Sequence, residues 1–185
     1  EHQSYEFDLL TKDINTTVDT LKQHAKEEAE KIEKDLQLAK QIQLSALPSS
    51  FPAFPHNFEF DLYAMMDAAK EVGGDFYDFY LVDSEHLAIQ IADVSGKGIP
   101  AAMFMMKAKA IIKSFVTSGL SIEKAYMEAN EKLCEGNDAQ MFVTAWLAVI
   151  DIKTGHVEFV SAGHNPPLIK HGDGGFEYLD FKPGF

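Results

Sequence analysis

The sequence of 185 residues contains no arginine, and its 16 basic residues are all lysines. Without arginine, no bidentate guanidinium fork is available to hold a phosphate or a carboxylate. The 29 acidic residues give a formal net charge of −13, whereas a nucleic-acid-binding surface requires clustered positive charge. We therefore expect no nucleic-acid partner, and any phosphate chemistry must use metal ions, lysines or backbone N–H groups.

Cysteine and long apolar runs are also scarce. The single cysteine, Cys134, excludes an intramolecular disulfide and favours a reducing compartment, the cytoplasm. No apolar run approaches the roughly 20 residues that a membrane-spanning helix requires. The chain starts at Glu1 without a methionine or a signal-peptide pattern. We expect it to be part of a longer protein, and any membrane attachment to come only through that parent.

The first part of the chain, residues 1–46, is predicted to be a helical linker and dimerisation segment, with one long helix over residues 5–46. It contains no glycine or proline and is rich in residues that favour helix. Apolar residues recur every three or four positions, as on one stripe of a helix: Val18, Leu21, Ala25, Ala29, Ile32, Leu36, Ala39 and Ile42. A narrow stripe on so long a helix is typical of a coiled coil, so we expect a homodimer through residues 5–46. The alternative is a single amphipathic helix that lies along the globular domain.

The second part, residues 47–185, has the pattern of one α+β domain behind a proline-containing linker at 47–57. Alternating apolar residues and turn signals predict strands at 58–62, 76–82, 87–93, 143–152, 157–161, 168–170 and 176–179. Helices are predicted over 101–118 and 121–133, the second with Ser121 as its N-cap. Two consecutive helices between groups of strands favour antiparallel sheets over alternating βαβ units.

Two acidic turns carry the candidate chemistry. Asp75 follows Gly73 and Gly74 directly before one predicted strand, and Asp93 ends the next strand. If these strands form a hairpin around residues 83–85, both carboxylates lie at the same end of the sheet, where oxygen ligands suit Mg²⁺ or Mn²⁺. Glycine and aspartate are also ordinary turn residues, so the residues by themselves leave open a metal site or two simple turns.

Other catalytic motifs are incomplete. The segment Gly96-Lys97-Gly98 lacks the spacing of a phosphate-binding loop, and Ser95 lacks the elbow motif of a nucleophilic serine. His164 is either a general acid or, as is more common for such a residue, a turn histidine with satisfied hydrogen bonds. None of these residues by itself defines a reaction.

Four ordered segments together resemble the bacterial SpoIIE/RsbU-type serine phosphatases of the metal-dependent PPM superfamily. They are residues 71–78 (EVGGDFYD), 93–101 (DVSGKGIPA), 141–145 (MFVTA) and 161–167 (SAGHNPP), and residues 43–48 (QLSALP) resemble the segment that opens that domain. The resemblance implies an αββα sandwich of antiparallel sheets flanked by helices. It also implies hydrolysis of phosphoserine or phosphothreonine on a protein, with two Mn²⁺ or Mg²⁺ ions.

By motif match, the resemblance makes Asp93 the carboxylate that bridges both metals and Asp75 a ligand of one of them. The backbone carbonyl of Val94 stands where the family supplies a further oxygen ligand. The family's remaining carboxylates lie in later motifs that do not occur before Phe185. We therefore expect a C-terminally incomplete domain that binds metal weakly and is catalytically impaired, an expectation that full Mn²⁺-dependent turnover by this chain would contradict.

The function implied by the resemblance is a phosphatase for a phosphorylated bacterial signalling protein of the anti-sigma-factor antagonist type. The predicted helical dimer would regulate it. The alternative is a non-catalytic dimeric signalling or binding module that keeps the PPM-like fold.

Overall fold

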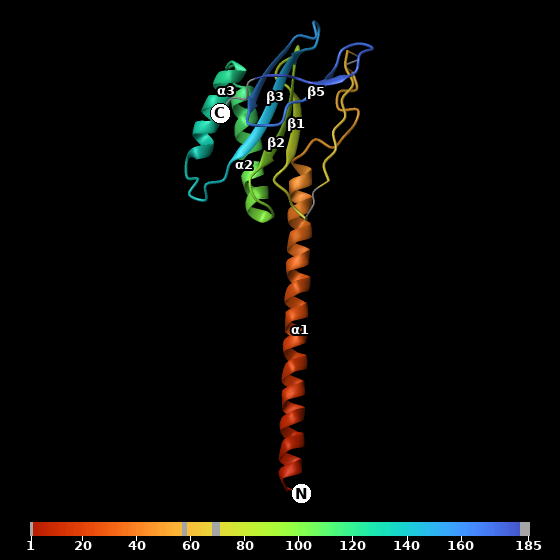
Figure 1. Ribbon diagram of the computed structural model, residues 1–185, viewed down its shortest axis with the longest axis vertical. Helices are drawn as coiled ribbons and strands as arrows, with labels where there is room; N and C mark the ends of the chain where they lie inside the picture. The colour runs from red at the N-terminus through yellow and green to blue at the C-terminus, as the bar shows by residue number, and fades with distance from the viewer. Residues whose placement is uncertain (1, 57–58, 68–70, 182–185) are drawn as a thin grey trace. The chain divides into compact units, whose positions relative to one another are not determined.

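The computed structural model describes residues 2–56, 59–67 and 71–181. The chain divides into two compact units, Glu1–Lys40 and Gln41–Phe185. Helix α1 (His2–Ser45) is drawn in Figure 1. Its residues up to Lys40 belong to the first unit, and residues 41–45 belong to the second. The helix predicted over 5–46 is thereby confirmed, whereas the functional division into 1–46 and 47–185 stays a prediction. Over the described ranges, no helix is long and apolar enough to cross a membrane.

The apolar stripe of α1 is uncovered in the single chain. The side chains of Val18, Leu21 and Ile32 are 40%, 64% and 60% exposed. Polar residues on the helix pair with each other one turn apart, as in the 2.7 Å hydrogen bond from Gln23 to Glu27, and such pairs stabilise a helix only modestly. Most of the stability of a helix comes from covering its apolar face, and one chain leaves that face open.

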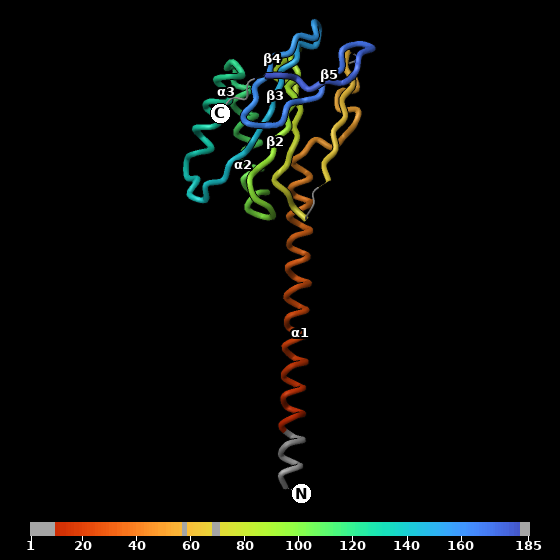
Figure 2. Tube along the Cα trace, in the orientation of Figure 1, coloured from red at the N-terminus to blue at the C-terminus, as the bar shows by residue number. Residues whose placement is uncertain are grey.

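The second unit is built on an antiparallel sheet in the order β1-β2-β3-β4. Its strands are β1 (Phe76–Leu81), β2 (His86–Val94), β3 (Val143–Asp151) and β4 (Val157–Ala162). Short turns join β1 to β2 and β3 to β4, as the trace in Figure 2 shows. All of these strands have nearly the bounds that the alternating apolar residues predict.

Helices α2 (Ile99–Val116) and α3 (Ile122–Cys134) pack together and contact the sheet (Figure 1). Alternate residues of a strand share one face, and those of the helix-covered face form one buried cluster with α2 and α3. The side chains of Phe76, Met105 and Leu147 lie at its centre, each at most 2% exposed. The predicted N-cap is confirmed, since Ser121 accepts a 3.5 Å hydrogen bond from the N–H of Lys124.

A two-stranded sheet contains β5 (Leu168–Lys170) and β6 (Phe176–Tyr178), as predicted. The strand predicted over 58–62 was wrong for 59–62, which form no strand, and Phe58 lies outside the described residues. Phe60 packs against Phe54 instead, with ring centroids 5.7 Å apart, and Phe54 packs against Phe79 of β1 at 6.0 Å. Phe60 thus attaches residues 59–62 through side-chain packing rather than backbone pairing.

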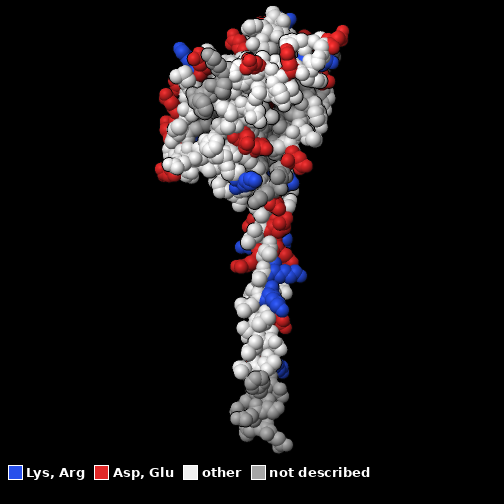
Figure 3. Space-filling model, in the orientation of Figure 1, with Lys and Arg blue, Asp and Glu red and all other residues white. Residues whose placement is uncertain are grey.

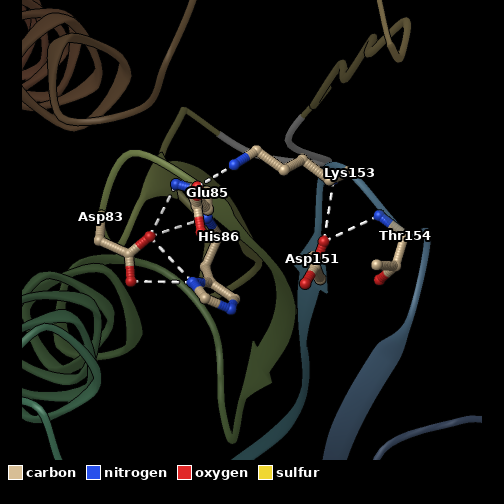
Figure 4. Close-up of polar contacts among 6 residues, drawn as sticks. All are labelled: Asp83, Glu85, His86, Asp151, Lys153 and Thr154. Atoms are coloured by element: carbon tan, nitrogen blue, oxygen red, sulfur yellow. Dashed lines mark hydrogen bonds and ion pairs between the residues drawn. The ribbon is translucent and has the colours of Figure 1, made fainter.

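Charged residues set the two turns at one end of the sheet (Figure 4). Asp83 accepts hydrogen bonds of 2.8 and 2.9 Å from the N–H groups of Glu85 and His86. The bond from Glu85 is the main reason that the pKa of Asp83 lies below its usual range. An ion pair from Lys153 to Glu85 joins the β1–β2 turn to the turn between β3 and β4. Hydrogen bonds and an ion pair thus hold the two turns at this end of the sheet, and the candidate site lies at the other end.

Candidate metal centre

The two predicted acidic residues lie at the same end of the sheet. Asp75 directly precedes β1, and Asp93 is the residue before the last of β2. Antiparallel pairing of β1 with β2 sets Phe76 opposite Ala92, so the turns that carry the two acids are adjacent. The hairpin around residues 83–85 on which this expectation depended is present.

The carboxyl groups of Asp75 and Asp93 lie close enough to interact, in the wall of one cavity. The pKa of Asp75 is raised, chiefly by partial burial and then by the interaction with the carboxyl group of Asp93 and its negative charge. Two carboxylates in contact repel each other when both are ionised, and a divalent cation between them would remove this repulsion.

A cavity of about 390 Å³ holds this pair. Both acidic turns line it, residues 72–75 on one side and 93–98 on the other, together with Met66, Phe142 and Thr144. On the face of the second unit drawn in Figure 3, acidic side chains are scattered among uncharged ones, with no continuous basic surface among the described residues. Among the described residues that line the cavity, Lys97 carries the positively charged side chain.

Glycine allows the two turns to touch. A Cβ placed on Gly74 would lie 2.8 Å from the carbonyl oxygen of Val94 and 3.0 Å from the Val94 Cβ. No other residue permits this approach without a shift of the backbone. The carbonyl of Val94, which the resemblance makes a metal ligand, therefore lies directly against the turn that carries Asp75.

Two hydrogen bonds between Ser95 and Phe142 hold the turn after Asp93. The N–H of Ser95 donates a 2.8 Å hydrogen bond to the carbonyl of Phe142, and the N–H of Phe142 donates one of 2.9 Å to Oγ of Ser95. Beyond it, Gly96 has a φ of 87°, in the left-handed region that glycine adopts without strain. Ser95 thus fixes the shape of the loop, and its hydroxyl is engaged rather than poised for attack.

His164 lies behind the cavity wall. Its Nδ1 is 2.9 Å from Oγ1 of Thr144, and Thr144 lines the cavity beside Asp93. Burial lowers the pKa of His164, while the charge of Asp93 acts in the opposite direction. The structure therefore gives this histidine a hydrogen-bond partner, as expected for the second of its two interpretations.

The described residues supply part of a divalent-cation site. Within 2–56, 59–67 and 71–181, no group of three or more His, Cys, Asp or Glu side chains could hold a metal ion. What is present is a pair of carboxylates in contact and a backbone carbonyl beside them, and hard oxygen donors of this kind suit Mg²⁺ or Mn²⁺. These residues fit such an ion, and further ligands would have to be water or groups outside this set.

Asp75→Asn is expected to raise the melting temperature of the metal-free chain at pH 7. The folded state raises the pKa of Asp75, so ionised Asp75 destabilises the fold above that pKa, and this penalty disappears below the ordinary value of about 3.9. The gain should therefore shrink as the pH falls toward 4. Thermal unfolding in EDTA measures it, with Asp173→Asn, exposed in the β5–β6 turn, as the control. A lower melting temperature for Asp75→Asn at pH 7 would contradict the repulsion.

One residue of the site was missed by the sequence analysis. Gln43, near the end of α1, is 3% exposed and makes hydrogen bonds to Gly73 in the loop before Asp75. Its neighbours follow an amphipathic helical pattern, in which a polar residue predicts exposure. The sole sequence signal was its place at the start of the QLSALP segment.

The second unit has the α+β architecture that the resemblance to the PPM class implies, and comparisons with known proteins support this class. The family model described as Stage II sporulation protein E (SpoIIE) matches residues 83–185. The chain is 31% identical to phosphoserine phosphatase RsbP of Bacillus subtilis over 150 residues, which are 79% of this chain and 36% of that protein. It is 31% identical to phosphoserine phosphatase RsbU of the same organism over 137 residues, 74% of this chain and 40% of RsbU. The chain belongs to the SpoIIE family.

Solved structures show the same fold. The SiaA-PP2C domain of Pseudomonas aeruginosa matches with a TM-score of 0.55 and 25% identity, over 72% of this chain and 54% of that one. The RsbU and RsbW domains of a Mycobacterium tuberculosis protein match with a TM-score of 0.54 and 25% identity, over 63% and 32%. The predicted α+β fold of the PPM class is confirmed. The chain spans 36% and 40% of the length of RsbP and RsbU.

Proposed function

We propose that this chain is the phosphatase part of a protein that removes phosphate from serine or threonine of a phosphorylated bacterial signalling protein. The observation that carries the proposal is that Asp75 and Asp93 line one cavity of about 390 Å³, with their carboxyl groups close enough to interact. Relatives that are named phosphoserine phosphatases support it. The proposed substrate is an anti-sigma-factor antagonist, because this is the substrate class that the resemblance to SpoIIE/RsbU-type phosphatases implies.

Asp75, Asp93 and the carbonyl of Val94 are the residues proposed to hold Mn²⁺ or Mg²⁺, with two ions in the complete site. When bound, such ions neutralise phosphate oxygens and lower the pKa of water so that it attacks phosphorus. Asp75 and Asp93 act as the catalytic residues by orienting these ions from two adjacent turns. The chain contains no arginine. Among the described residues that line the cavity, Lys97 supplies the positive charge that would attract a phosphate.

A non-catalytic dimeric signalling module is the second candidate. It is favoured by the absence of a third acidic, histidine or cysteine ligand beside the Asp75–Asp93 pair among the described residues. The two candidates differ in one measurable property, which is release of inorganic phosphate from a phosphoserine protein. Measured in the whole protein to which this chain belongs, release that requires Mn²⁺ and is lost in Asp93→Asn supports the phosphatase. Absence of Mn²⁺-dependent release from that folded protein supports the binding module.

We further propose that α1 makes a homodimer that regulates the domain, in the cytoplasm. The exposed apolar stripe of α1 supports the dimer, and the free cysteine Cys134 supports a reducing compartment. The route to the site is the end of α1, because its last turns belong to the same compact unit as the two acids.

Leu36→Pro is expected to shift the native dimer toward monomer. Proline in the interior of a helix removes a hydrogen bond and is unfavourable by about 3 kcal/mol, and Leu36 lies in the middle of the last third of α1. Sedimentation equilibrium of the whole chain over a range of concentrations measures the change, with Leu36→Ala as the control that keeps the helix. Dimerisation of Leu36→Pro equal to that of the native chain would argue against pairing through this segment.

A further inference from the structure

The end of α1 carries a buried polar side chain that the proposed mechanism does not use. Gln43 is 3% exposed, although its neighbours Gln41 and Ile42 are exposed. Its Nε2 donates a 2.6 Å hydrogen bond to the carbonyl oxygen of Gly73, and its Oε1 accepts a 3.1 Å bond from the N–H of the same residue. One side-chain amide thus satisfies both backbone groups of Gly73.

This pair of hydrogen bonds, one donated to the carbonyl and one accepted from the N–H of the same residue, resembles a hydrogen-bonded residue pair between antiparallel strands. It fixes the orientation as well as the position of the Gly73 backbone, since a shift of either partner breaks both bonds. Loss of the amide would leave partly buried backbone groups without their partner, which is unfavourable. Gly73 and Gly74 have no side chains to hold the loop by packing, so the hold must come from elsewhere, and Gln43 provides it.

The held residue is close to the metal centre in sequence and in space. Gly73 lies two positions before Asp75 and lines the same cavity. Its neighbour Gly74 lies against the carbonyl of Val94, where an added Cβ would be 2.8 Å from the oxygen. The loop is therefore held at two places. Gln43 makes hydrogen bonds to Gly73, and Val94 of β2 packs closely against Gly74. Asp75 is the next residue along the chain.

We propose that Gln43 is a positioning residue for the metal centre, whose amide holds Gly73 so that the carboxyl group of Asp75 meets that of Asp93. This inference rests on the proposed function, because it gives Gln43 a part in binding the divalent cation. Residues that orient a metal ligand without touching the metal typically change metal affinity by roughly 10–100-fold when they are lost. A residue that only anchored the helix end would change the melting temperature and leave metal affinity unchanged.

The test measures the affinity of the whole chain for Mn²⁺ alone, from the electron paramagnetic resonance signal of free Mn²⁺. The native chain is compared with Gln43→Leu, which removes the amide at nearly constant volume, and with Gln41→Leu, the same change at an exposed position of the same helix turn. Gln43→Leu is expected to raise the Kd about tenfold or more, and Gln41→Leu to leave it unchanged. A folded Gln43→Leu variant with native affinity overturns the proposal.

A second measurement uses the native chain and does not depend on the folding of a variant. In ¹⁵N-resolved NMR spectra, saturation with Mg²⁺ is expected to shift the side-chain amide signals of Gln43 and the backbone signal of Gly73, but not the side-chain signals of Gln41. A shift at the Asp75 backbone without one at Gln43 overturns the proposal. A native chain that binds neither ion overturns the metal centre itself, together with the role of Gln43. Native Mn²⁺ binding that Gln43→Leu leaves intact overturns only that role.

Discussion

In the whole protein to which this chain belongs, Asp93→Asn is expected to reduce Mn²⁺-dependent phosphate release from a phosphoserine protein by about 100-fold or more. The substitution keeps the size and shape of the side chain but removes the charge that would hold a divalent cation. Asp93 lines the same cavity as Asp75, and the carboxyl groups of the two residues interact. Loss of a single ligand or of its orientation typically lowers metal affinity or activity by roughly 10–100-fold, and loss of a shared ligand affects every ion that it binds.

The same variant should leave the fold intact. Asp93 is exposed and lies outside the buried cluster between the sheet and its helices. Removal of one of two mutually repelling carboxylates does not destabilise the metal-free chain. Thermal unfolding in EDTA checks this point, and Asp138→Asn, an exposed acid remote in sequence from both turns, controls for the change in net charge. A folded Asp93→Asn chain with native Mn²⁺ stimulation would rule out the proposed centre.

The hairpin that brings Asp75 and Asp93 together could be predicted because every step of it is local. Alternation of apolar residues in 76–82 and 87–93 predicts two strands, and a short polar segment between them predicts a turn. Once the strands pair, the register places the residues before the first strand beside those at the end of the second. Each of these rules depends only on neighbours in the sequence.

Contacts between distant segments could not be predicted in this way. The side chain of Gln43 reaches Gly73, 30 residues away, and the helical pattern does not indicate which distant backbone group its amide binds. The error at 59–62 has a related cause. An alternating apolar pattern fits a strand, but here Phe60 packs by its ring on Phe54, which in turn packs on Phe79. Which of the two occurs depends on whether a partner strand is adjacent, and that is a property of the whole fold.

A buried ion pair ties the strand after Asp75 to the helix after Asp93. The side chain of Asp78 in β1 is 2% exposed, and Oδ2 lies 2.7 Å from Nζ of Lys109 in α2, whose side chain is 12% exposed. The other carboxylate oxygen accepts a 3.0 Å hydrogen bond from the N–H of Phe79. Helix α2 follows directly on the loop after Asp93, and β1 follows directly on Asp75. The ion pair therefore holds together the two elements that come next after the two acids.

Lys109→Met is expected to destabilise the chain by about 3–5 kcal/mol, because it leaves the carboxylate of Asp78 buried without its partner. For a chain of this size the melting temperature should fall by roughly 10 °C. Lys113→Met is the matched control, since Lys113 is an exposed lysine of the same helix that lies over the ring of Tyr80, 4.4 Å from its centroid. Asp78→Leu combined with Lys109→Met should recover most of the loss, because replacing both partners by apolar groups removes the uncompensated charge. If Lys109→Met unfolds no more readily than Lys113→Met, the pair does not hold α2 to the sheet, and the geometry of the candidate centre must depend on the loops alone.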